Sequence, residues 1–99
     1  MREYSSPAVV EIPDDARLTD TLYARAATEP KATAARKQEP GGQWRAISVE
    51  EMQGDIVAHA KALINAGVEK GDRVALLSRT RYEWTVVDYA IWSVGGITV

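Results

Sequence analysis

The sequence predicts an α/β fold in which helices pack against a parallel sheet. Residues 74–77 are four consecutive apolar residues, which is typical of a strand buried on both faces. Residues 84–94 repeat apolar side chains at helical spacing, and residues 97–99 begin another apolar run. A strand, a helix and a strand in this order form a βαβ unit, which places two parallel strands in one sheet.

Residues 1–17 are predicted to form an extended lead-in segment. Pro7, Pro13 and the pair Asp14–Asp15 favour turns and extended backbone over a helix. The charges in this segment and its short apolar run exclude a signal peptide. We therefore expect the lead-in segment to pack against a body rather than to form one, and we expect residues 18–99 to be the incomplete start of a large domain.

A short helix is expected directly after the lead-in segment. Thr19 is a candidate N-cap, because threonine can accept a hydrogen bond from a free backbone N–H. Leu18, Leu22 and Ala26 then fall on one face of the helix, and Pro30 stops it.

Two strands joined as a β-hairpin are predicted next. Residues 32–36 and 44–47 flank a segment that contains Pro40, Gly41 and Gly42, which are turn-forming residues. The tip of the hairpin should therefore be exposed.

A long helix is predicted to follow the hairpin. Ser48 and Glu51 have the spacing of a capping box, in which the serine oxygen accepts from a backbone N–H and the glutamate reaches back to the serine N–H. Gly67 ends this helix, because glycine suits the left-handed conformation there. The apolar stripe that the helix should bury consists of Val49, Met52, Ile56, Ala60, Leu63 and Ile64.

The last predicted helix lies between the two parallel strands. Thr80 and Glu83 repeat the capping-box spacing, and Gly95 and Gly96 end the helix. It is apolar on more than one side, so it should contact the sheet on one face and further structure on another. One stripe consists of Trp84, Val87, Ile91 and Val94, and Tyr82, Tyr89 and Trp92 lie on other faces.

The composition is that of an ordinary globular protein and excludes several classes of partner and site. The net charge is −2 and no lysine- or arginine-rich block is present, which argues against nucleic acid as a partner. The absence of cysteine excludes disulfides and thiolate metal sites and fits the reducing cytoplasm. The most apolar segment, residues 84–99, is interrupted by Asp88 and two glycines and is too short to span a membrane.

We predict that the 99 residues alone are too few to shelter their apolar strands and helix. A parallel sheet needs neighbours on both edges and cover on both faces. Each large apolar side chain that stays exposed to water loses roughly 1.5 to 3 kcal/mol of stabilisation by burial. The net free energy of unfolding of a domain is only about 5 to 15 kcal/mol. We therefore expect this chain to be the front of a longer protein and to be unstable or sticky by itself.

No residue of the chain is assigned a catalytic, cofactor-binding or metal-binding role. The link between the predicted strand at residues 74–77 and the next helix lacks the glycines of a phosphate loop. His59 is the single histidine, and we interpret it as a structural residue that pairs with Asp55 one helical turn earlier. Arg79 and Arg81 are the only local sign of a site, because they follow the carboxyl end of a strand. Solvation or ion pairing is the favoured interpretation of both arginines.

The order of the pieces resembles the amino-terminal start of the adenylate-forming acyl-CoA synthetase superfamily. The resemblance covers nearly the whole chain, and its strongest parts are AGVEKGDRVALL at residues 66–77 and RYEW followed by GGITV at residues 81–99. The second part is most similar to bacterial, actinobacterial-type long-chain fatty-acid CoA ligases.

This resemblance implies a two-step reaction in the complete enzyme. A fatty-acid carboxylate attacks the α-phosphate of ATP with Mg²⁺, and the thiol of coenzyme A then displaces AMP from the acyl-adenylate. The phosphate loop, adenine motif, hinge and catalytic lysine of the superfamily lie beyond the stretch matched here. The matched residues therefore correspond to scaffold, and the four lysines outside any catalytic motif are Lys31, Lys37, Lys61 and Lys70.

Other interpretations stay open at the level of sequence. A related adenylate-forming enzyme could activate an aryl or amino acid, because the acid-binding pocket lies outside this segment. A non-catalytic α/β module that binds a partner protein, or itself, through the apolar edges near Val99 is the alternative from a different class. For the enzyme we expect a cytoplasmic location, with peripheral membrane association as an open question.

Overall fold

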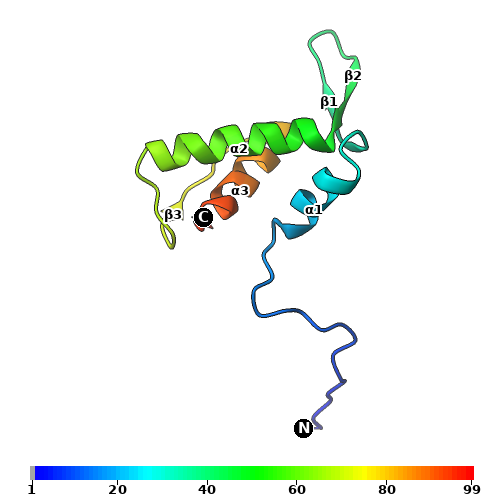
Figure 1. Cartoon of the computed structure of the whole chain (residues 1–99), viewed down its shortest axis with the longest axis vertical. Coiled ribbons are helices and arrows are strands. Elements are labelled where there is room, and N and C mark those ends of the chain that lie inside the picture. Colours follow the sequence, from blue (N-terminus) through cyan, green and yellow to red (C-terminus); the bar gives the residue numbers. More distant parts are fainter. Residues whose placement is uncertain (1) are drawn as a thin grey trace.

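The computed structural model describes residues 2–99, which form a small helical body with two separate pairs of strands. Figure 1 shows α2 lying across α3, the β-hairpin at the end where α2 begins, and the lead-in segment running away from the body. The elements are α1 (Asp20–Thr28), β1 (Thr33–Gln38), β2 (Trp44–Ser48), α2 (Val49–Asn65), β3 (Arg73–Val74), α3 (Tyr82–Ser93) and β4 (Ile97–Thr98).

The predicted α/β fold with a βαβ unit is confirmed. Strands β3 and β4 pair in parallel, with Arg73 opposite Ile97 and Val74 opposite Thr98, and α3 connects them. Backbone hydrogen bonds continue the pairing beyond the two strands, since Val99 N–H donates to the Val74 carbonyl and Leu76 N–H to the Val99 carbonyl, both at 3.0 Å.

The prediction of a four-residue strand buried on both faces was wrong for the described residues. β3 ends at Val74, and Ala75 and Leu77 are exposed, Leu77 to 100%. Within residues 2–99 this sheet has only two strands, so it lacks the neighbours that would cover a longer central strand.

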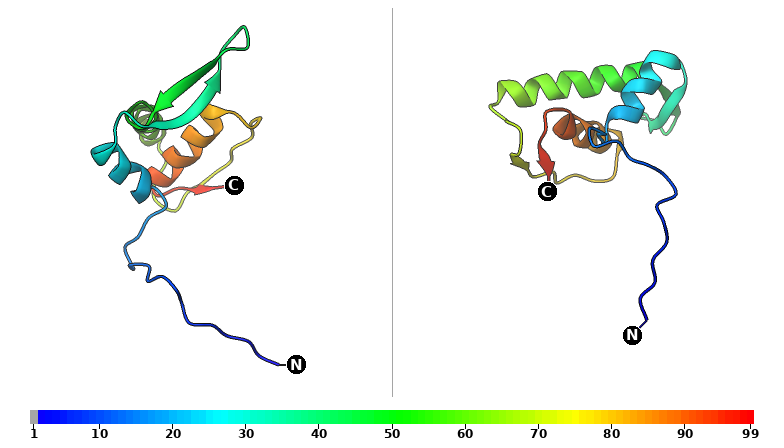
Figure 2. Two further views of the ribbon diagram at one scale, coloured as in Figure 1. Left: turned by 90° about the vertical axis from the view of Figure 1, so that its right-hand side faces the viewer. Right: turned by 60° about the horizontal axis from the view of Figure 1, so that its bottom comes forward.

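The predicted hairpin is confirmed and is slightly longer than expected. β1 and β2 pair antiparallel from Gln38 opposite Trp44 to Thr33 opposite Ser48, with an irregularity near the open end. In the turn, Glu39 N–H donates to the Gln43 carbonyl at 2.7 Å. The loop glycines have positive φ angles of 97° and 88°, which explains why glycine occupies both positions. Figure 2 shows the hairpin projecting from the helical body.

Only one of the two hydrogen bonds of the predicted capping box forms at the start of α2. Ser48 Oγ accepts from the Glu51 N–H at 3.2 Å, as predicted. The Glu51 side chain does not complete the box; its carboxylate accepts from Arg45 of β2 at 2.8 Å. The helix end is confirmed, because Gly67 has a φ of +97° and its N–H donates to the Ile64 carbonyl at 3.0 Å.

The buried face of α2 is close to the predicted one. Val49, Met52, Ile56 and Ala60 are buried, and Leu63 is half-buried. Ile64 was predicted wrongly, because 61% of it is exposed. It lies in the last turn of the helix, where the rest of the described body no longer covers it.

The start and the buried face of α3 both differ from the prediction. The helix begins at Tyr82, its N-cap position is held by Arg81, and no side chain caps it. The capping box of Thr80 and Glu83 was therefore wrong, because the Glu83 carboxylate is engaged by two cations instead. Of the predicted stripe, Ile91 is buried but Trp84 is 40% exposed.

The core lies between α2 and α3 and is closed by the hairpin and α1. Its buried members are Ile47, Met52, Ile56, Ala60, Val86 and Ala90. Tyr82 and Tyr89, which were predicted to lie away from the main stripe, pack against this core together with Val94. The face of α3 that meets α2 is thus centred on Val86 and Ala90.

Helix α1 forms as predicted but is capped differently. Thr19 occupies the N-cap position and is buried, yet its side chain makes no capping hydrogen bond. Asp20 Oδ2 instead accepts from the Arg17 N–H at 2.8 Å. Leu18 is exposed, so the predicted apolar face is reduced to the half-buried Leu22 and its neighbour Ala26.

Candidate functional site

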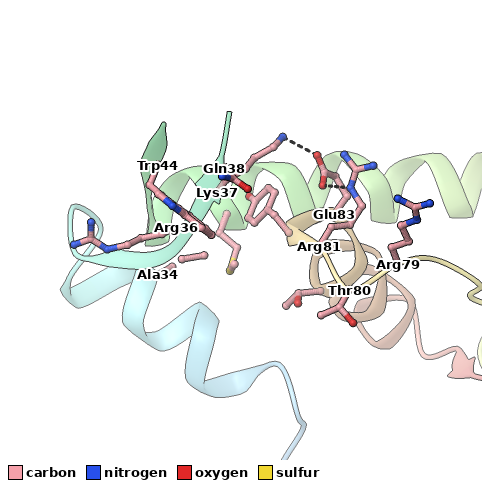
Figure 3. Close-up of a pocket in the computed structure, with 13 residues that line it drawn as sticks. Ala34, Arg36, Lys37, Gln38, Trp44, Arg79, Thr80, Arg81 and Glu83 are labelled. Atoms are coloured by element: carbon pink, nitrogen blue, oxygen red, sulfur yellow. Dashed lines mark hydrogen bonds and ion pairs between the residues drawn. The ribbon is translucent and has the colours of Figure 1, made fainter. Parts of the chain in front are cut away.

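A hollow of about 710 Å³ lies between the hairpin and the start of α3. Residues 34–38 and Trp44 form one wall, residues 79–83 form the other, and Met52 of α2 contributes to the lining. We call it the hairpin hollow. Figure 3 shows Lys37 reaching from the hairpin to Glu83 on the opposite wall, whereas the Arg36 side chain extends away from that wall.

Glu83 is the electrostatic centre of the hairpin hollow. Its carboxylate accepts from Arg81 Nε at 2.7 Å and from Lys37 Nζ at 2.6 Å. These two cations, Arg81 first, lower the pKa of Glu83 from an ordinary 4.5 to about 2. The carboxylate therefore stays ionised and fastens the start of α3 to β1.

Tyr82 joins this site to α2. Its hydroxyl donates to Asp55 Oδ2 at 2.6 Å, and Lys37 Nζ lies 5.6 Å from the centre of its ring. Burial, followed by the neighbouring Asp55 carboxylate, raises the pKa of Tyr82 well above its usual value. The phenol is thus a fixed hydrogen-bond donor and not a base.

The two arginines singled out from the sequence both line the hairpin hollow, but they differ in their contacts. Arg81 forms the ion pair with Glu83, which is the structural role favoured from the sequence. Arg79 is exposed, and among residues 2–99 no carboxylate forms an ion pair with it.

The predicted pairing of His59 with the Asp55 side chain was wrong, because the partner of His59 is the backbone of Asp55. The ring Nδ1 of His59 lies 2.8 Å from the backbone carbonyl of Asp55, while the carboxylate of that residue is held by Tyr82. His59 is exposed, and this contact joins it to the backbone of its own helix, α2.

Sequence patterns did not identify the cluster of Lys37, Tyr82 and Glu83. Lys37 and Glu83 lie 46 positions apart, and Tyr82 and Asp55 lie 27 apart, so no local spacing connects them. Trp44 was predicted as a strand residue, and its place at the hairpin hollow follows only from the packing of the hairpin against α3.

The described residues offer neither a metal site nor a membrane span. Within residues 2–99, no three side chains of histidine, cysteine, aspartate or glutamate gather closely enough to hold a metal ion. None of the described helices combines the length and the apolar character needed to cross a bilayer.

Comparisons with known proteins agree with the fold. A family model described as AMP-binding enzyme matches residues 22–99. The chain is 34% identical over all its 99 residues to the long-chain-fatty-acid–CoA ligase FadD15 of Mycobacterium tuberculosis, and it spans 16% of the length of that protein.

Solved structures share the same arrangement of elements. CmiS6 superposes with a TM-score of 0.77 and 27% identity, over 95% of this chain and 24% of that protein. The N-terminal domain of FACL13 from Mycobacterium tuberculosis superposes with a TM-score of 0.70 and 26% identity, over 83% of this chain and 20% of that domain.

Proposed function

The chain belongs to the family of AMP-binding enzymes, and on that basis we propose that it is the amino-terminal scaffold of a longer ATP-dependent long-chain fatty-acid CoA ligase. The observation that carries this proposal is the 34% identity to FadD15, which extends over every residue of the chain. The chain spans only 16% of the length of that relative. The activity, substrates and partners given below are therefore proposed for a longer protein.

The proposed reaction has two steps. A fatty-acid carboxylate oxygen attacks the α-phosphate of ATP and pyrophosphate leaves; the thiol of coenzyme A then attacks the acyl carbonyl and AMP leaves. Mg²⁺ would neutralise the phosphates in the first step. Residues 2–99 gather no ligand set for such an ion, so we place its site elsewhere in the longer protein.

The proposed role of this chain is to start the sheet on which the rest of the domain is built. The parallel pair β3–β4, covered by α3, leaves Leu77, Ile97 and Val99 exposed. Such residues suit a sheet that continues with further parallel strands. Without that continuation we propose that the 99 residues are inactive and self-associate through this apolar edge.

For the longer protein we propose a cytoplasmic location at the periphery of the membrane. The cysteine-free sequence suits a reducing compartment. A long-chain fatty acid partitions into bilayers, since each buried CH₂ group contributes roughly 0.8 kcal/mol. Vesicle co-sedimentation of the longer protein tests this location.

Pyrophosphate release by the longer protein tests the proposed reaction. The protein is supplied with ATP, Mg²⁺, coenzyme A and a panel of long-chain, medium-chain, aryl and amino acids. Release with long-chain acids, together with formation of the thioester, supports the proposal. Preference for an aryl or amino acid would reassign the substrate, and no release with any acid would favour a non-catalytic module.

A further inference from the structure

The hairpin hollow holds an excess of positive charge in a chain whose net charge is −2. Its lining includes one carboxylate, Glu83, which pairs with Lys37 and Arg81. Arg79 also lines the hollow, whereas Arg36 belongs to the lining but extends away from the opposite wall. Even without Arg36, three cations against one carboxylate leave two positive charges uncompensated by the lining. This local excess favours an anionic ligand.

Arg79 is the cation best placed to bind that ligand. It is exposed, and among residues 2–99 it forms no ion pair. Residues 75–81, which contain it, form neither helix nor strand. Figure 3 shows the Arg79 and Arg81 side chains extending from this stretch towards the same side. A guanidinium group donates two parallel hydrogen bonds to a phosphate or a carboxylate. Arg79 can therefore bind an anion while Arg81 stays paired with Glu83.

The size of the charge excess favours one kind of anion. A carboxylate carries a single negative charge, whereas a phosphate monoester carries about −1.5 to −2 at neutral pH. A phosphate monoester thus compensates both positive charges. The volume of about 710 Å³ lies within the range typical of small-molecule sites, so the organic group on the phosphate fits as well.

The remaining lining suits an apolar organic group. The indole of Trp44 is 64% exposed, so its face is open for stacking on a ring or an aliphatic chain. Ala34, Ala35 and Met52 add apolar atoms between the walls. A ligand with a phosphate at one end and an apolar group at the other matches both parts of the hairpin hollow.

We propose that the hairpin hollow binds an organic phosphate monoester, with the phosphate on Arg79 beside Arg81 and the apolar group against Trp44. This site is separate from the reactive centre of the ligase, which we place outside residues 2–99, and it does not depend on the ligase reaction. A water-soluble phosphate ester and the head group of phosphatidic acid both present this chemistry.

Titration calorimetry of the longer protein with 1-naphthyl phosphate tests the site. Arg79→Gln should weaken binding by about tenfold or more, because it removes charge-assisted hydrogen bonds. The Arg79 side chain is exposed and unpaired among the described residues, so the fold should be retained. Arg73→Gln is the control, since this exposed arginine of β3 lies outside the hairpin hollow and should leave binding unchanged.

Two further comparisons separate the phosphate contact from the apolar contact. Naphthalene-1-sulfonate has the same ring with a single negative charge, and it should bind about tenfold more weakly. Trp44→Leu should weaken 1-naphthyl phosphate by about threefold or more and leave inorganic phosphate unaffected, because only the organic group contacts the indole.

Co-sedimentation with phosphatidylcholine vesicles that contain phosphatidic acid distinguishes the two sources of the ligand. Binding to these vesicles that Arg79→Gln removes, with vesicles of phosphatidylcholine alone as the control, supports the proposal with a lipid as the source. Binding of 1-naphthyl phosphate that Arg79→Gln removes supports it with a soluble ligand. The proposal is overturned if neither probe binds, if Arg79→Gln binds as the parent does, or if Arg73→Gln weakens binding equally.

Discussion

The hydroxyl of Tyr82, the first residue of α3, donates a 2.6 Å hydrogen bond to Oδ2 of Asp55 in the middle of α2. This contact joins the two helices that enclose most of the core. The next residue, Glu83, is held by Lys37 of β1, so the start of α3 is fixed against both α2 and the hairpin.

Removing the Tyr82 hydroxyl tests this connection. In Tyr82→Phe a half-buried carboxylate loses its donor, and we expect a loss of about 1.5 kcal/mol in the free energy of unfolding. Tyr23→Phe is the matched control, because the hydrogen bond of the Tyr23 hydroxyl is to the exposed Ser93 Oγ, at 3.2 Å. Its cost should stay below about 0.5 kcal/mol. Urea unfolding compares the two, and equal costs would contradict the role given to Tyr82.

The ion pairs of Glu83 predict a dependence of stability on acidity. Its pKa is lowered to about 2 in the folded protein, so the unfolded state binds the proton more readily. The stabilisation is complete above about pH 4.5 and is lost as the pH falls towards 2. The side chain is 36% exposed, so water screens the pairs and the effect is smaller than the change in pKa alone implies.

Glu83→Gln checks this dependence. The variant should be less stable than the parent protein at pH 6, and the gap between their urea midpoints should narrow as the pH approaches 2. Glu69→Gln, at an exposed position away from these cations, is the control. A gap that is the same at pH 6 and pH 3 would show that the ion pairs of Glu83 contribute nothing.

Local patterns predicted the elements with definite boundaries. The hairpin was identified because Gly41 and Gly42 permit a turn, and both α2 and α3 end where a glycine adopts positive φ, at Gly67 and Gly95. The parallel pairing followed from the order of elements. These features depend on residues close together in sequence, where backbone sterics decide the outcome.

Features that depend on distant partners could not be predicted in this way. Helix α3 is apolar around most of its circumference, so periodicity gave no reason to prefer Val86 over Trp84 for the core. Glu83 had capping-box spacing, but Lys37, far away in the sequence, competes for its carboxylate. The length of β3 depends on neighbouring strands, which periodicity does not report.

Two isoleucines of α2 test whether burial, and not position on the apolar stripe, determines how much a residue stabilises the fold. Ile56 is completely buried and Ile64 is 61% exposed, although both fall on the predicted apolar stripe. Ile56→Ala should cost about 2 to 5 kcal/mol, because it leaves a cavity between α2 and α3. Ile64→Ala should cost less than about 1 kcal/mol. Denaturant titration of both variants measures this difference, and similar costs would mean that the longer protein covers Ile64.

Two glycines test the turn at the end of α3. Gly95 has a φ of +78°, and a Cβ there would lie 2.9 Å from Lys70 Cγ, so Gly95→Ala should destabilise by about 1 to 3 kcal/mol. Gly54, inside α2, has nothing within 4 Å of an added Cβ, and Gly54→Ala should stabilise by up to about 1 kcal/mol. Opposite signs in thermal melts are expected; a loss in both would contradict the assigned geometry.

The central claim is that these 99 residues are scaffold for an adenylate-forming ligase whose reactive groups lie elsewhere in a longer protein. The most direct measurement is ATP- and fatty-acid-dependent pyrophosphate release by the 99-residue chain and by the longer protein, side by side. We predict release by the longer protein and none by the 99 residues, which should also associate through their exposed apolar edge. Pyrophosphate release by the 99-residue chain alone would contradict the claim.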